Sequence, residues 1–122
     1  MTITHMDITS VPDAVMSHCV IHGNMVYLAG IRASTFPADI RTQTKEVLAT
    51  IDSYLARAGT KRSNILTAQV WLKDMGLFQE MNEVWNTWVD AESPPSRACV
   101  SGELCRPEIL VEIMVTALKG GN

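Results

Sequence analysis

Residues 94–115, PPSRACVSGELCRPEILVEIMV, place one arginine and one glutamate in two stretches that otherwise have the composition of β-strands. The last seven of these residues are apolar except for Glu112, and Arg97 leads into the apolar residues of the first stretch. Charged side chains inside apolar strands are costly unless they are paired or take part in binding or chemistry. This segment therefore bears on both the fold and the functional site.

The two stretches predict strands at about residues 97–102 and 108–118. Alternation divides the second strand into two faces, with Ile109, Val111, Ile113 and Val115 on one and Leu110, Glu112, Met114 and Thr116 on the other. The second face is too apolar to lie open to water, so both faces of the sheet are expected to be covered. We expect the protein to be a homo-oligomer in which a neighbouring subunit covers this second face of the sheet.

Upstream, the pattern indicates three strands, a helix, a strand and a second helix. The first strands are predicted at residues 3–9, 14–22 and 25–30, with Gly23-Asn24 as a hairpin turn. The first helix is predicted to follow the N-cap Asp39, to end before Gly59, and to bury Val47, Leu48, Ile51, Leu55 and Ala58. The second helix is marked by Leu77, Phe78, Met81, Val84, Trp85 and Trp88.

Between the helices lies a predicted strand at residues 64–73. One of its faces is expected to carry Leu66, Ala68, Val70 and Leu72. The resulting order βββαβαββ predicts an α+β fold with a six-stranded, mostly antiparallel sheet and both helices on one face. The 122 residues are predicted to form a single domain, 1–122.

Composition disfavours several classes of protein. The formal net charge of −3, without clustered basic residues, predicts no nucleic-acid partner. The N-terminus lacks the pattern of a secretion signal, and no apolar run approaches the roughly 20 residues of a membrane span. Three cysteines without CxxC spacing predict neither a disulfide framework nor structural zinc. The expected location is the cytoplasm, with no membrane partner.

Arg97 and Cys99 are expected to share a strand face, because they are two residues apart. A symmetric hairpin centred between Cys105 and Arg106 would place Cys99 opposite Glu112, which would bring a guanidinium, a thiol and a carboxylate together. An arginine fork suits a substrate carboxylate, and a shielded glutamate suits the activation of a water. A structural ion pair between Arg97 and Glu112 accounts for the same residues equally well.

These residues resemble the RidA family, also called the YjgF family, over almost the whole chain. The resemblance rests on Ser96-Arg97-Ala98-Cys99-Val100 and Val111-Glu112-Ile113, with the family's spacing between the cysteine and the glutamate. Further matches are Gly23-Asn24-Met25, Ala29-Gly30, Asp39 through Gln43-Thr44, Val70-Trp71-Leu72-Lys73-Asp74, and Phe78 with Asn82.

The resemblance implies a chorismate-mutase-like fold assembled as a homotrimer, with active sites at the clefts between subunits. It also implies hydrolysis of reactive 2-imino acids, or of their enamine tautomers, to 2-keto acids and ammonia. By this analogy Arg97 binds the substrate carboxylate, Glu112 and Cys99 position the attacking water, Gly30 offers a backbone contact, and Asn82 supports the site. No cofactor is expected, because a protonated imine is already electrophilic.

The chain departs from the family at the pocket. Met16 stands where well-studied members have a tyrosine, Ala29 stands where they have a serine, and Arg32 adds a cation just beyond Gly30. The family's Leu-Pro loop is replaced by residues 103–107, ELCRP. These differences favour a less polar pocket, or a dedicated catabolic deaminase for a different imine or enamine.

Two other functions remain open. The main one is a non-catalytic, regulatory trimer that binds a keto acid or amino acid through Arg97. An endoribonuclease, as some relatives are described, is the weaker one, because the chain is acidic and lacks a base-stacking motif.

Three further groups of residues have simpler structural interpretations. No metal site is predicted from His18, Cys19 and His22, because the cysteine of a strand would point away from both histidines. Cys99 lacks a histidine base close in sequence, which disfavours covalent catalysis. The periodic placement of the tryptophans indicates core or interface positions for Trp71, Trp85 and Trp88.

Overall fold

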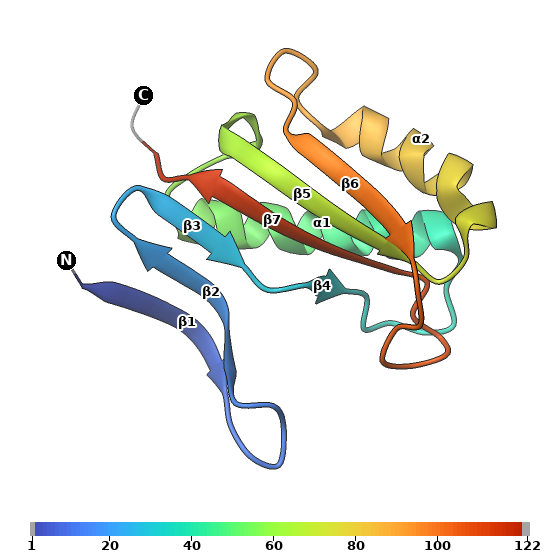
Figure 1. The fold of residues 1–122 in the computed structure, drawn as a ribbon, viewed down its shortest axis with the longest axis horizontal. Coiled ribbons are helices and arrows are strands. Elements are labelled where there is room, and N and C mark those ends of the chain that lie inside the picture. Colours follow the sequence, from blue (N-terminus) through green and yellow to red (C-terminus); the bar gives the residue numbers. More distant parts are fainter. Residues whose placement is uncertain (1, 121–122) are drawn as a thin grey trace.

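The computed structural model describes residues 2–120 and consists of a mixed β-sheet with two helices packed against one face (Figure 1). The elements are β1 (Ile3–Thr9), β2 (Met16–His22), β3 (Met25–Leu28), β4 (Ile31–Arg32), α1 (Ile40–Arg57), β5 (Ile65–Leu72), α2 (Phe78–Trp88), β6 (Ser96–Ser101) and β7 (Val111–Leu118). Short 3₁₀ turns, η1 (Arg62–Asn64) and η2 (Met75–Leu77), precede β5 and α2. The strand order is β1-β2-β3-β7-β5-β6, and β4 also pairs with β7.

The predicted α+β class and the two helices on one face are confirmed, whereas the predicted strand number is wrong. The sheet has seven strands rather than six, because the two-residue strand β4 pairs with β7 beyond the end of β3. Two residues are too few to produce a detectable alternation in the sequence.

The boundaries of α1 follow from its predicted caps. The carboxylate of Asp39 accepts a hydrogen bond from the backbone N–H of Thr42 at 2.8 Å, which satisfies one of the free N–H groups at the start of a helix. At the other end, Gly59 has a φ of +81°, in the left-handed region where a side chain would be strained. The predicted apolar face is buried over Val47, Leu48, Ile51, Leu55 and Ala58.

The core lies between this helix face and the sheet. The four residues assigned to the helix side of the last strand, Ile109, Val111, Ile113 and Val115, are all buried. On β5 the prediction fails at one end, where Leu66 is 44% exposed and Ile65 only 3%. A shift in the pairing register with β7 between Ile65 and Thr67 reverses the alternation there.

The predicted hairpin between the last two strands is wrong. β6 pairs with one edge of β5 in parallel, with Cys99 beside Val70. β7 pairs with the other edge in antiparallel fashion, with Glu112 beside Trp71. The helix α2 crosses over between β5 and β6, and such a crossover is what parallel neighbours require. Figure 1 shows β5 lying between β6 and β7.

A cluster of polar groups fastens the β1–β2 hairpin to the end of α1. Asp7 has a positive φ of 53°, and its carboxylate accepts two hydrogen bonds from the Arg57 guanidinium, both at 2.9 Å. The hydroxyl of Tyr54 donates a third, at 2.6 Å. These bonds, that from Arg57 above all, hold the pKa of Asp7 well below its usual range, whereas burial and the Asp7 carboxylate raise the pKa of Tyr54 to about 12.

We expect Asp7→Asn to lower the melting temperature at pH 7 and to have a smaller effect at pH 3. Because folding depresses the pKa of Asp7, its charge stabilises the folded state above the unfolded pKa of about 3.9, and this contribution declines as the pH falls toward the folded pKa. Calorimetry at both pH values measures the difference. Asp13→Asn, in the loop of the same hairpin, is the control. A melting difference that is the same at both pH values would contradict the assigned role.

Candidate active site

Arg97 lies on the face of β6 that is covered by α2. It pairs with the buried Ala68 of β5, and its side chain is half-buried. The guanidinium carbon lies 5.2 Å from the centre of the Trp85 ring and 5.7 Å from that of Phe78. Its Nη1 atom is buried and, among residues 2–120, has no hydrogen-bond partner. A buried cationic donor without a partner is unusual in a folded protein, and it suits an anion supplied from outside the chain.

Cys99 shares this face, as predicted, because it pairs with the buried Val70 and packs against the core. Burial raises the pKa of its thiol, and the charge of Arg97 offsets only part of this effect. The group is therefore a neutral thiol at neutral pH. A neutral thiol can hold a water by hydrogen bonding, but it is a poor nucleophile.

Asn82 lies on the same side of α2 as the two aromatic rings. It follows Phe78 by four residues and precedes Trp85 by three, so the three side chains share one helix face. Asn82 is half-buried. We call Arg97, Cys99, Phe78, Asn82 and Trp85 the arginine cluster.

Glu112 points to the opposite face of the sheet. Its neighbours Val111 and Ile113 are fully buried toward the helices, so alternation directs Glu112 away from them. Its carboxylate rests against Gly30, where a Cβ atom would lie only 2.1 Å from Oε2. Position 30 must therefore be glycine for the carboxylate to occupy this place.

A cavity of about 460 Å³ opens beside Gly30 and Glu112. Its lining also includes Met16, Arg32 and Glu46. This volume falls within the roughly 300–1,000 Å³ of small-molecule sites. We call Gly30, Glu112, Met16 and Arg32 the glutamate cluster.

Ala29 and Arg32, at which the sequence departs from the family, lie at this cluster. Ala29, directly before Gly30, donates its backbone N–H to the carbonyl of His18 at 2.9 Å. Arg32 pairs with Glu112 across β4 and β7, and its Nη1 donates to Sγ of Cys105 at 2.8 Å. Cys105 is exposed in the loop before β7. Sequence reasoning missed this contact, since the two residues are far apart in the chain and no motif links them.

The arginine and glutamate clusters therefore do not meet within one chain. β5 separates Cys99 from Glu112, and the side chains of Arg97 and Glu112 project from opposite faces of the sheet. The predicted single patch is wrong for one subunit. The alternative prediction, a structural ion pair between Arg97 and Glu112, is also wrong for one subunit, because the ion pairs of residues 2–120 do not include this pair.

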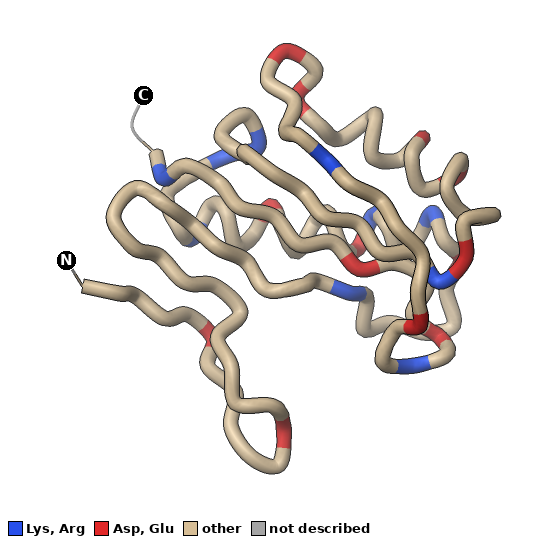
Figure 2. Tube along the Cα trace, in the orientation of Figure 1, with Lys and Arg blue, Asp and Glu red and all other residues tan. Residues whose placement is uncertain are grey.

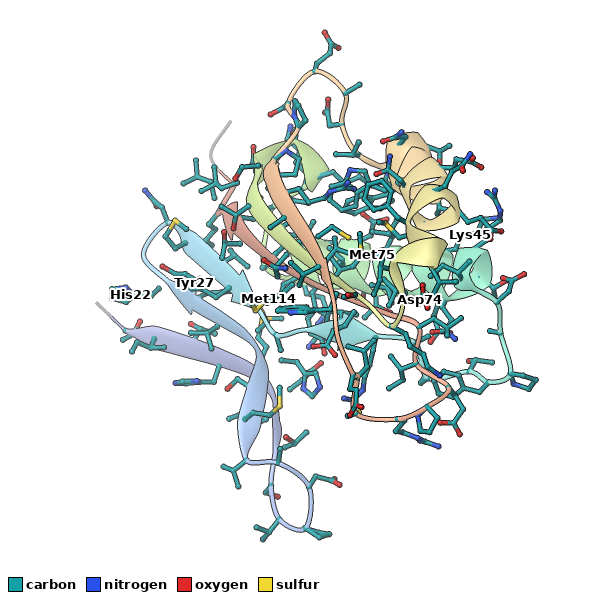
Figure 3. All side chains as sticks on the ribbon, turned by 45° about the vertical axis from the view of Figure 1, so that its right-hand side comes forward. His22, Tyr27, Lys45, Asp74, Met75 and Met114 are labelled. Carbon is teal, nitrogen blue, oxygen red and sulfur yellow. The ribbon has the colours of Figure 1, made fainter. Side chains whose placement is uncertain are left out.

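His18, Cys19 and His22, which were compared with a set of metal ligands, lie in three different environments. The ring of His18 stacks on Tyr54, with centroids 6.3 Å apart, and Cys19 is fully buried in the core. His22 is exposed at the end of β2, as Figure 3 shows. Within the described residues 2–120, no group of three His, Cys, Asp or Glu side chains could hold a metal ion. Nor does that part of the chain contain a helix long and apolar enough to cross a membrane.

Comparison with known proteins supplies the family. Residues 9–119 match the family model described as Endoribonuclease L-PSP. The chain belongs to the RidA (YjgF) family. A RutC family protein of Haemophilus influenzae is 46% identical over 107 residues, which cover 87% of this chain and 92% of that protein. The RutC family protein YoaB of Escherichia coli is 38% identical over 117 residues, which cover 96% of this chain and 98% of that protein.

Solved structures of similar proteins share the fold. A YjgF family member from Neisseria meningitidis has a TM-score of 0.91 and 38% identity, and the match covers 100% of this chain and 98% of that one. A protein from Salmonella typhimurium, described as a putative translation initiation inhibitor, has a TM-score of 0.83 and 32% identity, with 96% and 97% covered. These likenesses confirm the family and the fold expected from the sequence motifs.

Proposed function

We propose that this RidA-family protein hydrolyses reactive 2-imino acids, and their enamine tautomers, to 2-keto acids and ammonia. The observation that carries the proposal is the state of Arg97. Its guanidinium is held against two aromatic rings, and its buried Nη1 has no partner among residues 2–120. A carboxylate, which every 2-imino acid has, would satisfy this donor with a charge-assisted hydrogen bond.

The separation of the two clusters supports an assembly in which each site is completed by a neighbouring subunit. We propose a homotrimer in which the arginine cluster of one subunit faces the glutamate cluster of the next. The sheet face opposite the helices supports such an assembly, because it exposes several large apolar side chains: Tyr27, Leu66, Val100, Met114 and Leu118. Figure 3 shows Tyr27 and Met114 on the sheet.

The expected mass in solution is three times the 13.4 kDa of the chain, measured by light scattering. The apolar sheet face requires a cover, and closed rings are a common form of homo-oligomer. Met114→Glu, which places a charge in this face, is expected to lower the mass. A parent protein that is a stable monomer would contradict the assembly and leave each site incomplete.

The proposed reaction uses only side chains of this protein and one water. Arg97 binds the substrate carboxylate through its fork, and the backbone N–H of Gly30 contributes a further hydrogen bond. The water, held by the Cys99 thiol, forms a bond to the imine carbon as Glu112 accepts its proton. Glu112 returns this proton to the nitrogen of the addition intermediate, and the carbon–nitrogen bond then breaks as the new hydroxyl group gives its own proton to Glu112, which forms the carbonyl and releases ammonia. Asn82 supports the substrate, and no cofactor is required.

Three further residues are proposed to determine which imines enter the site. Met16 provides an apolar wall of the cavity and Ala29 has no polar group, so these two positions offer no hydrogen bond to a polar substrate side chain. Arg32 places a cation beside Glu112. These features favour a substrate range that differs from that of relatives with tyrosine and serine at positions 16 and 29.

An amino-acid oxidase that generates imines in the assay tests the proposal. The protein is expected to accelerate the release of ammonia and 2-keto acid above the spontaneous rate in water. Binding of a 2-keto acid without any acceleration would favour the second candidate, a non-catalytic carboxylate-binding trimer. The same lack of polar groups at positions 16 and 29 favours that candidate.

An endoribonuclease, the activity in the description of the family model, has less support. Lysine and arginine residues are dispersed among acidic ones over the described chain, as Figure 2 shows, rather than gathered on one surface. Binding to the phosphate backbone needs a concentrated basic surface. Cleavage of single-stranded RNA by the trimer would overturn this ranking.

Gly30→Ala is expected to abolish most of the deaminase activity at little cost in stability. The added methyl group would occupy the place of Glu112 Oε2, which is the end of a flexible side chain and can move away. The displaced carboxylate could then no longer accept a proton from the water. Gly102→Ala is a matched control, because a Cβ at that position meets nothing within 4 Å. Turnover and melting temperature of the two variants provide the comparison, and an active Gly30→Ala variant would contradict the placement of Glu112.

A further inference from the structure

We propose that Trp85 and Phe78 are positioning residues for Arg97, whose guanidinium they hold in the orientation that receives the substrate carboxylate. This inference rests on the proposed function and assigns two residues to the carboxylate-binding part of the same site. Neither residue is proposed to touch the reacting atoms.

The first observation concerns what holds Arg97 in place. Arginines buried in proteins are usually oriented by carboxylates, which occupy their N–H groups and neutralise their charge. Among residues 2–120, Arg97 has no such ion pair, and its guanidinium instead packs against the rings of Trp85 and Phe78. A guanidinium stacks on aromatic faces without using its N–H groups. The two rings can therefore fix the fork while leaving it free to bind an anion.

The second observation is that Trp85 is itself immobilised. It is 6% exposed, and its ring lies 5.5 Å from that of Trp88, at a tilt of 48°. Trp88 in turn donates from Nε1 to the carboxylate of Asp52 at 3.0 Å. Arg62 lies over the Trp88 ring and donates twice to the same carboxylate, at 2.8 and 2.9 Å. A continuous series of contacts thus connects α1, through α2, to Arg97 on β6.

This arrangement makes a specific kinetic prediction. The two rings contact Arg97, which is proposed to bind the substrate carboxylate and takes no part in the proton transfers at the reacting carbon. Weakening the attraction between the rings and the cation should therefore impair carboxylate binding and raise KM, with kcat nearly unchanged. A purely structural role would instead reduce the fraction of folded protein and lower the apparent kcat.

The experiment changes the electron distribution of each aromatic ring while it preserves the shape of the ring. Pentafluorophenylalanine is installed at position 78 and compared with the parent, and it is installed at position 85 and compared with Trp85→Phe. Fluorination removes the negative face of the ring at nearly constant volume. Binding of 2-ketobutyrate to the trimer is measured by calorimetry, and turnover is measured on the imine of the same carbon skeleton.

We expect each fluorinated ring to raise Kd and KM by about 5- to 30-fold, with kcat and melting temperature close to those of the matched ring. If the variants at position 85 do not fold, the comparison at position 78 still tests the proposal, because there the fluorinated protein is compared with the natural protein. Equal affinities within both pairs would overturn the positioning role alone. A parent that binds 2-ketobutyrate but does not accelerate imine hydrolysis would overturn the proposed catalysis alone, and the binding comparison would still decide the role of the rings.

Discussion

Glu112→Gln is expected to reduce the turnover of 2-imino acids by about 10²–10⁴-fold, the usual contribution of a general base. Glutamine keeps the shape of the side chain and part of its hydrogen bonding, but it cannot accept a proton from the attacking water. Affinity for a 2-keto acid should change far less, because Arg97 is the residue proposed to contact the carboxylate. Turnover in the oxidase-coupled assay and binding by calorimetry measure the two effects on one preparation.

The nearby Glu46 provides a matched control for this prediction. It lines the same cavity, but its carboxylate accepts hydrogen bonds from the backbone N–H and the hydroxyl of Ser34, at 2.7 and 3.1 Å. Glu46→Gln removes the same charge from the same cavity and should leave turnover within a few-fold of the parent. A Glu112→Gln protein with full deaminase activity and a lowered melting point would show that the role of Glu112 is structural.

Arg97→Lys is expected to weaken binding of 2-keto acids by about 10- to 100-fold, the cost of losing a charge-assisted hydrogen bond. Lysine retains the positive charge but lacks the planar fork that binds both oxygens of a carboxylate. The mass of the proposed trimer should not change. Calorimetry measures the affinity, and light scattering measures the mass.

Arg106→Lys is the control for the arginine substitution. Arg106 also packs against an aromatic ring, that of Phe36, but it is exposed in the loop before β7. This variant should bind 2-keto acids as the parent does. If Arg97→Lys also bound a 2-keto acid as tightly as the parent, Arg97 would not be the carboxylate-binding residue.

The parts of the fold that could be predicted are those in which local chemistry determines the structure. The cap at Asp39 and the glycine at position 59 defined α1, and strict alternation defined the buried side of β7. The shared face of Arg97 and Cys99 followed from the same alternation. Family motifs then supplied the expected roles, which no single local pattern provides.

The predictions that proved wrong concern strand pairing and register, for which several arrangements satisfy the same local pattern. A hairpin and a crossover both allow β6 and β7 to alternate, so the sequence of those strands does not select their partners. The strand–helix–strand order of β5, α2 and β6 is typical of a parallel crossover, and from this order the parallel pairing of β6 with β5 could have been predicted. The register shift near Ile65 and the contact between Gly30 and Glu112 depend on long-range packing and have no counterpart in local sequence.

Complementation between these two impaired variants, assayed at a substrate concentration that does not saturate Arg97→Lys, tests most directly whether Arg97 and Glu112 of different subunits form one site. Arg97→Lys and Glu112→Gln chains are co-expressed with different tags, and mixed trimers are purified through both tags. If neighbouring subunits supply the two residues, one of the three sites in every mixed trimer combines an intact Arg97 with an intact Glu112, and about a third of the parental turnover should return. Mixed trimers no more active than the separate variants would contradict a site shared between subunits.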